Sequence, residues 1–134
     1  MNFAFSEEQE ELRKVAADFL TNKSSEAEVR RLMETEDGYD PAVWSQMAEQ
    51  LGLQGLAIPE EFGGTPVDPA TEVQTFAMVA EEIARGDSGL ADKLVQIWKI
   101  SKLLQNIAPR HLLEKWFPRI VEDHPRARIT PCVV

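Results

Sequence analysis

Residues 40–64 read DPAVWSQMAEQLGLQGLAIPEEFGG and contain the clearest structural signals of the chain. Asp40 can cap a helix, and Pro41 suits the first helical position, where a missing backbone N–H costs nothing. Gly52 suits the left-handed conformation in which many helices end. These signals predict a helix that begins at Pro41 and ends just before Gly52.

The next seven residues, Leu53–Pro59, are apolar, but the segment is too short and too broken by Gly55 to form a helix. We interpret it as a buried extended connection. It leads into a turn at Glu60–Gly64, whose two adjacent glycines lack the spacing of a dinucleotide or phosphate loop. The glycines are therefore interpreted as part of a turn and not as a cofactor site.

Two further helices are predicted before this stretch and three after it. A capping box, in which the cap and the third helical residue bond to each other's backbone, fits the start of the first helix. Prolines and glycines mark several of the other boundaries. The predicted starts are Ser6, Ser24 or Ser25, Asp68, Asp87 or Ser88, and Pro109, while Gly86 ends the fourth predicted helix and Pro118 kinks or ends the sixth.

Apolar residues recur with the helical period in these segments, which predicts one buried stripe on each helix. The stripe of the fourth predicted helix comprises Val73, Phe76, Ala77, Ala80, Ile83 and Ala84, and that of the fifth comprises Leu90, Leu94, Ile97, Trp98, Ser101 and Leu104.

The predicted fold is all-α, an up-and-down bundle of about six helices joined by short loops. Residues 126–134 are different, because they read as the start of a β-strand at the end of the chain. No second segment reads as a strand that could pair with it. We therefore expect a helical domain at 1–125, followed by a strand-like tail.

Composition excludes several classes of function. The chain has 134 residues and a formal net charge of −9, which argues against binding nucleic acid through phosphate neutralisation. The single cysteine, Cys132, excludes an internal disulfide and fits a reducing compartment. No apolar stretch approaches the roughly 20 residues of a membrane span, and the N-terminus lacks the features of a secretory signal. We expect a soluble, cytoplasmic protein.

The charge is unevenly distributed along the chain. Residues 1–92 carry a net charge of −14, whereas residues 93–134 carry +5. One interpretation is that the late helices simply expose solvated Lys and Arg side chains. The other is that this basic part lies near an acidic neighbour or an anionic ligand.

The residues give no support for a catalytic or metal site in this chain. Adjacent glutamates such as Glu81 and Glu82 point about 100° apart on a helix, so they suit solvent better than shared acid–base work. Neither His111 nor His124 follows a glutamate by three residues, as a di-metal bundle site requires. Cys132 lies in an apolar tail that favours the unreactive thiol. We assign no catalytic, cofactor-binding or metal-ligating residue.

Several segments, in their order and spacing, resemble the N-terminal helical domain of the acyl-CoA dehydrogenases. The most specific of them is the glycine-containing stretch that follows the third predicted helix. The resemblance covers nearly the whole chain. The segments are MNFAFSEEQ at 1–9, LGLQGLAIPEEFGG at 51–64, VAEEIARGDSGL at 79–90 and LEKWFPRI at 113–120.

The resemblance implies an FAD-dependent oxidoreductase that desaturates an acyl-CoA thioester between its α and β carbons. In that family the catalytic base lies in a C-terminal helical domain, and most FAD contacts come from that domain and a middle β-domain. It implies that residues 126–134 begin the β-domain, whose flavin-contacting Thr-Glu-Pro segment is absent here. We therefore expect the 134-residue chain alone to bind no FAD and to be inactive.

The resemblance also implies a role for the fifth predicted helix in walling the acyl tail. On this basis the substrate-pocket candidates are Leu94, Gln96, Trp98 and Ser101. Each could equally be an ordinary core or surface residue of the bundle. Trp98 is the strongest candidate, because a large ring would shorten the space for the acyl tail.

Two alternatives stay open from the sequence. The chain could be a stand-alone helical interaction module without flavin chemistry, or the same domain of a nitroalkane oxidase or a flavin-dependent hydroxylase. If it belongs to a larger enzyme, its partners are the β-domain and the C-terminal helical domain, and acyl-CoA binds only in that context. The isolated chain should then expose an apolar face and self-associate.

Overall fold

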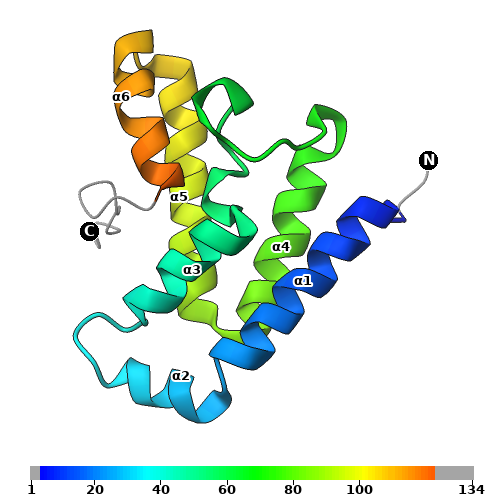
Figure 1. Ribbon diagram of the computed structural model, residues 1–134, viewed down its shortest axis with the longest axis vertical. Helices are drawn as coiled ribbons and strands as arrows, with labels where there is room; N and C mark the ends of the chain where they lie inside the picture. Colours follow the sequence, from blue (N-terminus) through cyan, green and yellow to red (C-terminus); the bar gives the residue numbers. More distant parts are fainter. Residues whose placement is uncertain (1–3, 123–134) are drawn as a thin grey trace.

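The computed structural model describes residues 4–122, which form an all-α bundle (Figure 1). The prediction of an all-α bundle of about six helices is confirmed for these residues. The expected strand-like tail at 126–134, with Cys132, lies outside the described residues, as does His124. The α-helices are α1 (Glu7–Lys23), α2 (Glu26–Met33), α3 (Pro41–Leu51), α4 (Glu72–Gly86), α5 (Ser88–Ile107) and α6 (Arg110–Val121), and short 3₁₀ helices lie at Leu53–Gly55, Glu60–Phe62 and Pro69–Thr71.

The caps of α1, α3 and α5 form at residues that the sequence predicts. Ser6 and Gln9 make the reciprocal capping box at the start of α1, with distances of 3.2 and 2.9 Å. Asp40 accepts the backbone N–H of Ala42, so Pro41 begins α3 as expected. The sequence left two candidate caps for α5, Asp87 and Ser88, and in the structure the cap is Asp87.

The connection after α3 is buried but not extended, which corrects the prediction for Leu53–Pro59. It turns continuously, since the N–H of Gly55 donates to Gly52 and that of Ile58 donates to Gly55. These bonds satisfy backbone groups that an isolated extended segment would bury without partners. Thr65 closes the loop, because its hydroxyl donates to the carbonyl of Gly52 at 2.8 Å.

The fourth helix begins later and faces the core differently than predicted. Asp68 and Pro69 open a 3₁₀ turn, and the α-helix starts at Glu72. Val73, placed in the core by the periodicity argument, is 77% exposed. The buried face of α4 comprises Thr75, Met78, Val79, Glu82 and Ile83.

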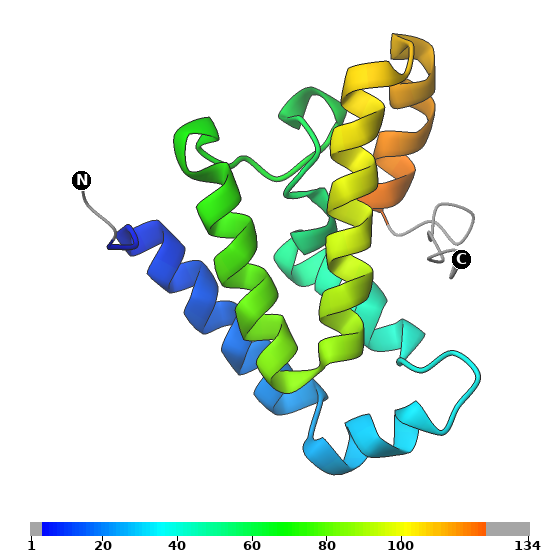
Figure 2. The same cartoon turned by 180° about the vertical axis from the view of Figure 1, so that it is seen from behind.

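This buried face of α4 packs against α1, and two polar pairs join the two helices there. The side chain of Gln9 donates to the Thr75 hydroxyl at 3.0 Å in a buried hydrogen bond. Arg13 lies 3.2 Å from the carboxylate of Glu82, which is 8% exposed. Seen from behind, α1, α4 and α5 lie side by side in that order across the molecule (Figure 2).

Helix α6 continues through Pro118 to Val121, so the proline does not end it. The proline cannot donate to the carbonyl of Glu114, but this residue is exposed and its carbonyl can bond water. The buried ring of Phe117 packs edge-on against Phe62, with centroids 5.5 Å apart. This contact joins α6 to the loop that follows α3.

Candidate functional site

A groove of about 500 Å³ runs along the surface between α4 and α5. Its walls are almost entirely apolar, and its only charged side chains are two lysines. The lining residues are Val73, Phe76, Ala77, Ala80, Val95, Trp98, Lys99 and Lys102. The stripe of α4 that the sequence analysis placed in the core therefore forms much of one wall.

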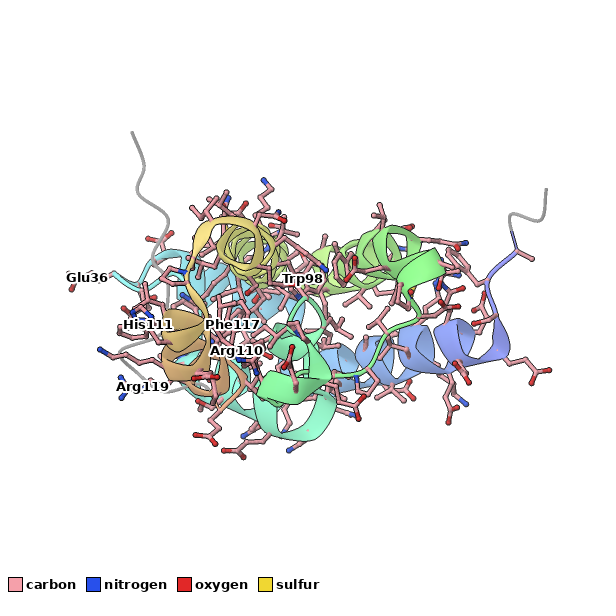
Figure 3. All side chains as sticks on the ribbon, turned by 90° about the horizontal axis from the view of Figure 1, so that it is seen from above. Glu36, Trp98, Arg110, His111, Phe117 and Arg119 are labelled. Carbon is pink, nitrogen blue, oxygen red and sulfur yellow. The ribbon has the colours of Figure 1, made fainter. Side chains whose placement is uncertain are left out.

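Two stacked aromatic rings form the centre of the groove. The rings of Phe76 and Trp98 lie 5.0 Å apart at an interplanar angle of 21°. The indole N–H of Trp98 donates to the carbonyl of Leu53 at 2.8 Å, so the loop after α3 fixes the orientation of this ring. Figure 3 shows Trp98 on the side of α5 that faces α4. The groove wall is thus built on a rigid support.

The rim of the groove is cationic. Lys102 forms an ion pair with Glu72 and lies 6.0 Å from the centroid of the Phe76 ring. Lys99 is exposed, and no ion pair to it is found among residues 4–122. Apolar walls beside a positive rim suit an amphiphile that carries a hydrocarbon part and an anionic part.

The four predicted pocket residues do not lie together in this groove. Trp98 is buried to 4% exposure and contributes to the lining, whereas Leu94 and Ser101 are fully buried away from it. Gln96 is half-buried outside the lining. The Ser101 hydroxyl has no hydrogen-bond partner among the described residues. The role of these residues toward a substrate stays a prediction.

Sequence reasoning missed several residues of the groove. On α5 the lining positions follow the spacing i, i+3, i+4 and i+7, which could have been found as a second stripe beside the core stripe. On α4 the apolar stripe was found but assigned to the core. The missed residues are Val95, Lys99 and Lys102 on α5 and Val73, Phe76, Ala77 and Ala80 on α4.

The acidic pairs that might suggest catalysis are engaged in ion pairs or exposed to solvent. Glu81 pairs with Arg85 at 2.7 Å, while the adjacent Glu82 turns inward to Arg13. Glu61 accepts a hydrogen bond from Arg110 at 2.9 Å, and this contact raises the pKa of the arginine above its ordinary value. Within residues 4–122, no three His, Cys, Asp or Glu side chains are placed to hold a metal ion.

Comparisons with known proteins agree with the fold. The family model of the acyl-CoA dehydrogenase N-terminal domain matches residues 6–124. Acyl-CoA dehydrogenase IpdE2 of Mycolicibacterium smegmatis is 42% identical over 80 residues, which are 60% of this chain and 24% of that relative. The protein of the same name from Mycobacterium tuberculosis is 35% identical over 79 residues, covering 59% and 24%.

Each match spans about a quarter of the length of the relative. No solved structure matches the chain. In the part of the chain that the structure describes, no helix is both long enough and apolar enough to cross a membrane. With a family model that matches most of its residues, this chain belongs to the acyl-CoA dehydrogenase N-terminal domain family.

Proposed function

We propose that this chain is the N-terminal domain of an FAD-dependent acyl-CoA dehydrogenase-like oxidoreductase, and that the α4–α5 groove walls the acyl tail of its substrate. Family membership and the names of two relatives support the reaction class. The observation that carries the role of the domain is the groove itself, with Trp98 stacked on Phe76 between apolar walls.

The chemistry of the groove suits a hydrocarbon better than a flavin. A flavin ring needs hydrogen-bond partners for its nitrogen and oxygen atoms, yet the polar groups here are mostly engaged. The Trp98 N–H donates to Leu53, and Lys102 pairs with Glu72. We therefore assign FAD to the part of the longer relatives that this chain does not span. The chemistry that FAD supplies when bound is acceptance of a hydride from the substrate.

The chain's own contribution is to exclude water from the acyl tail and to limit its length. The indole N–H of Trp98 donates to the carbonyl of Leu53 in the loop after α3, so an acyl chain cannot displace the ring without breaking this buried hydrogen bond. We propose that residues 126–134 begin the following β-domain in a cytoplasmic enzyme. By this proposal the 134-residue chain alone binds no FAD and catalyses nothing.

The test uses the complete enzyme, with the coding sequence after Val134 determined first. Both Phe76→Ala and Trp98→Ala should shift the ratio of kcat/KM toward longer acyl-CoA substrates by about tenfold, because they lengthen the apolar space. Phe76→Ala is the cleaner variant, since this ring is only half-buried and makes no hydrogen bond.

A matched control is Trp116→Ala, which removes the same side chain from α6, outside the groove. It should leave the chain-length profile unchanged. An unchanged profile in both groove variants, with FAD content and thermal stability intact, would refute the acyl-wall role. A stop codon directly after Val134 would instead favour the stand-alone interaction module.

The alternatives have less support. An interaction module should be polar on every outer helix face, whereas Val73 and Ile107 are 77% and 68% exposed. The two relatives carry the name dehydrogenase and not oxidase or hydroxylase. Measuring which substrate reduces the flavin of the complete enzyme separates these reaction classes.

A further inference from the structure

An ion pair between Glu72 and Lys102 joins α4 to α5 at one end of the groove. Glu72 is the first residue of α4, and its neighbour Val73 lines the groove together with Lys102. The side chains of Lys102 and Glu72 are 40% and 28% exposed, so the pair is partly covered. Two opposite charges therefore bridge the two walls of the groove where α4 begins.

A second cavity, of about 230 Å³, lies beyond this ion pair. Lys102 lines both the groove and the second cavity, and its partner Glu72 lines the second cavity. Most of the other lining residues are apolar and belong to the loop between α3 and α4, for example Leu56 and Val67. The ion pair thus separates two spaces that both suit hydrocarbon.

The loop that lines the second cavity has a defined backbone. The side-chain amide of Gln105 on α5 donates to the carbonyl of Ala57 at 2.6 Å. The N–H of Gly64 donates to the carbonyl of Pro59 at 3.1 Å. A Cβ atom at Gly64 would lie 1.7 Å from the carbonyl oxygen of Ile58, so only glycine fits this close approach. The cavity is therefore built into the fold.

Both ribbon views agree with this arrangement. They show the loop between α3 and α4 beside the second half of α5, near the point where α4 begins (Figures 1 and 2). The groove between α4 and α5 therefore leads toward this loop at the end marked by Val73 and Lys102, and away from it at the end marked by Ala80 and Val95.

The ion pair gives the groove a polar end. An alkyl tail gains free energy with each methylene group that it buries against apolar walls. To pass between Glu72 and Lys102, the tail would have to part the two charges and cover them with hydrocarbon. This removes water from both charges and supplies no new partner for either. The gain from a further methylene group is then lost, so the tail stops at the pair.

We propose that the Glu72–Lys102 ion pair sets the longest acyl tail that the groove accepts, because it separates the groove from the second cavity. This inference rests on the function proposed above, in which the groove holds the acyl tail. Phe76 and Trp98 bound the tail along the centre of the groove, and the ion pair bounds it at the end. Without the two charges, the groove and the second cavity form one longer apolar space.

The complete enzyme tests this proposal through two substrates that differ only in tail length, octanoyl-CoA and tetradecanoyl-CoA. Glu72→Gln/Lys102→Met removes both charges and keeps side chains of similar length. It should raise the ratio of kcat/KM for the longer substrate to that for the shorter one by about tenfold. The value for octanoyl-CoA itself should stay within about threefold. Lys102→Arg preserves the ion pair and should leave the ratio unchanged.

A third substitution identifies the second cavity as the space that the longer tail enters. Val67→Trp places a large side chain in the lining of this cavity, on a half-buried loop position. Added to Glu72→Gln/Lys102→Met, it should cancel the tenfold gain for tetradecanoyl-CoA. If the gain persists, the tail does not enter this cavity and the proposal is overturned.

A matched control removes an ion pair elsewhere. Arg30 and Glu26 on α2 pair at 2.7 Å outside both cavities, so Glu26→Gln/Arg30→Met should leave the ratio unchanged. Circular dichroism and FAD content verify that each variant is folded, as expected when partly exposed ion pairs are removed. An equal gain in this control would overturn the proposal.

Two further outcomes would also overturn it. One is an unchanged ratio in Glu72→Gln/Lys102→Met. The other is an equal loss of kcat/KM for both substrates, which would show that Lys102 binds an anionic group of the substrate. The Phe76→Ala test keeps the two proposals apart. If Phe76→Ala shifts the chain-length profile and Glu72→Gln/Lys102→Met does not, the groove holds the tail but the ion pair does not limit it.

Discussion

Helix α4 has two faces that differ in an unexpected way. The face against α1 contains polar residues, Thr75 and Glu82, and is buried. The face beside α5 contains Val73, Phe76 and Ala77, and it is exposed or only half-buried. The buried face also contains the apolar residues Met78, Val79 and Ile83, whereas the exposed face carries an apolar stripe that its own bundle does not cover. Such an exposed stripe is typical of a helix that also contacts something outside its own bundle.

The difference shows that a buried helix face can contain polar groups as long as each of them has a partner. Thr75 accepts a hydrogen bond from Gln9, and the Glu82 carboxylate lies 3.2 Å from Arg13, so both buried polar groups of the inner face have a partner on α1. The outer face has no such partners, and its apolar side chains line an open groove. The inner face holds the bundle together, and the outer face is available for binding.

The largest expected effect comes from comparing the same change, valine to alanine, on the inner and the outer face of α4. Val79→Ala on the inner face should destabilise the domain by about 2 kcal/mol, because this side chain is fully buried. Val73→Ala on the outer face should cost less than about 0.5 kcal/mol. Urea unfolding followed by circular dichroism measures both. Equal losses would contradict the assignment of the two faces.

A smaller effect should follow from breaking one polar pair of the inner face. Thr75→Val keeps the shape of the side chain but leaves the buried Gln9 amide without its acceptor, at a cost of about 1.5 kcal/mol. The matched control is Thr21→Val on the exposed side of α1, where water replaces the lost bond. It should cost less than about 0.5 kcal/mol. The same unfolding experiment compares them, and no loss for Thr75→Val would show that the pair does not hold α1 to α4.

The smallest effect concerns an ion pair at the surface, between Arg31 and Glu28 of α2, and contrasts with the more buried pair of the inner face. The hydrogen bond from Arg31 lowers the pKa of Glu28 below its ordinary value. The contribution of this ion pair to the stability of the fold is therefore present above the ordinary glutamate pKa. It is lost as the pH falls through the lowered pKa of Glu28. NMR titration of the Glu28 carboxyl carbon should show this lowered midpoint, and Arg31→Gln should restore the ordinary one. The same midpoint in both proteins would contradict the assigned contact.

Much of the secondary structure could be predicted because its causes are local. Asp40, Pro41 and Gly52 bound α3 as predicted, since capping and backbone conformation depend on a few neighbouring residues. The loop at Leu53–Gly55 was misread because its backbone bonds could not be inferred from apolar composition. Its closure by Thr65 depends on a contact made thirteen residues away along the chain.

Less of the candidate site could be predicted. Trp98 was found through family resemblance, but its stacking on Phe76 joins two helices and leaves no local signal. Leu94, Trp98 and Ser101 are all buried, yet Trp98 alone of the three also lines the groove. Adjacent positions on a helix differ by about 100°, so a small error in the orientation of the helix exchanges core and groove residues.

By itself, the sequence determined that the chain is helical, where most helices begin and end, and which family it resembles. These properties follow from caps, prolines, glycines and periodic apolar residues, which act over a few residues. Only the tertiary structure decided which face of α4 is buried and that an apolar groove beside α5 stays open. The reason is that the contacts between these faces join residues far apart along the chain, such as Gln9 and Thr75, which are 66 residues apart and meet only when α1 packs on α4.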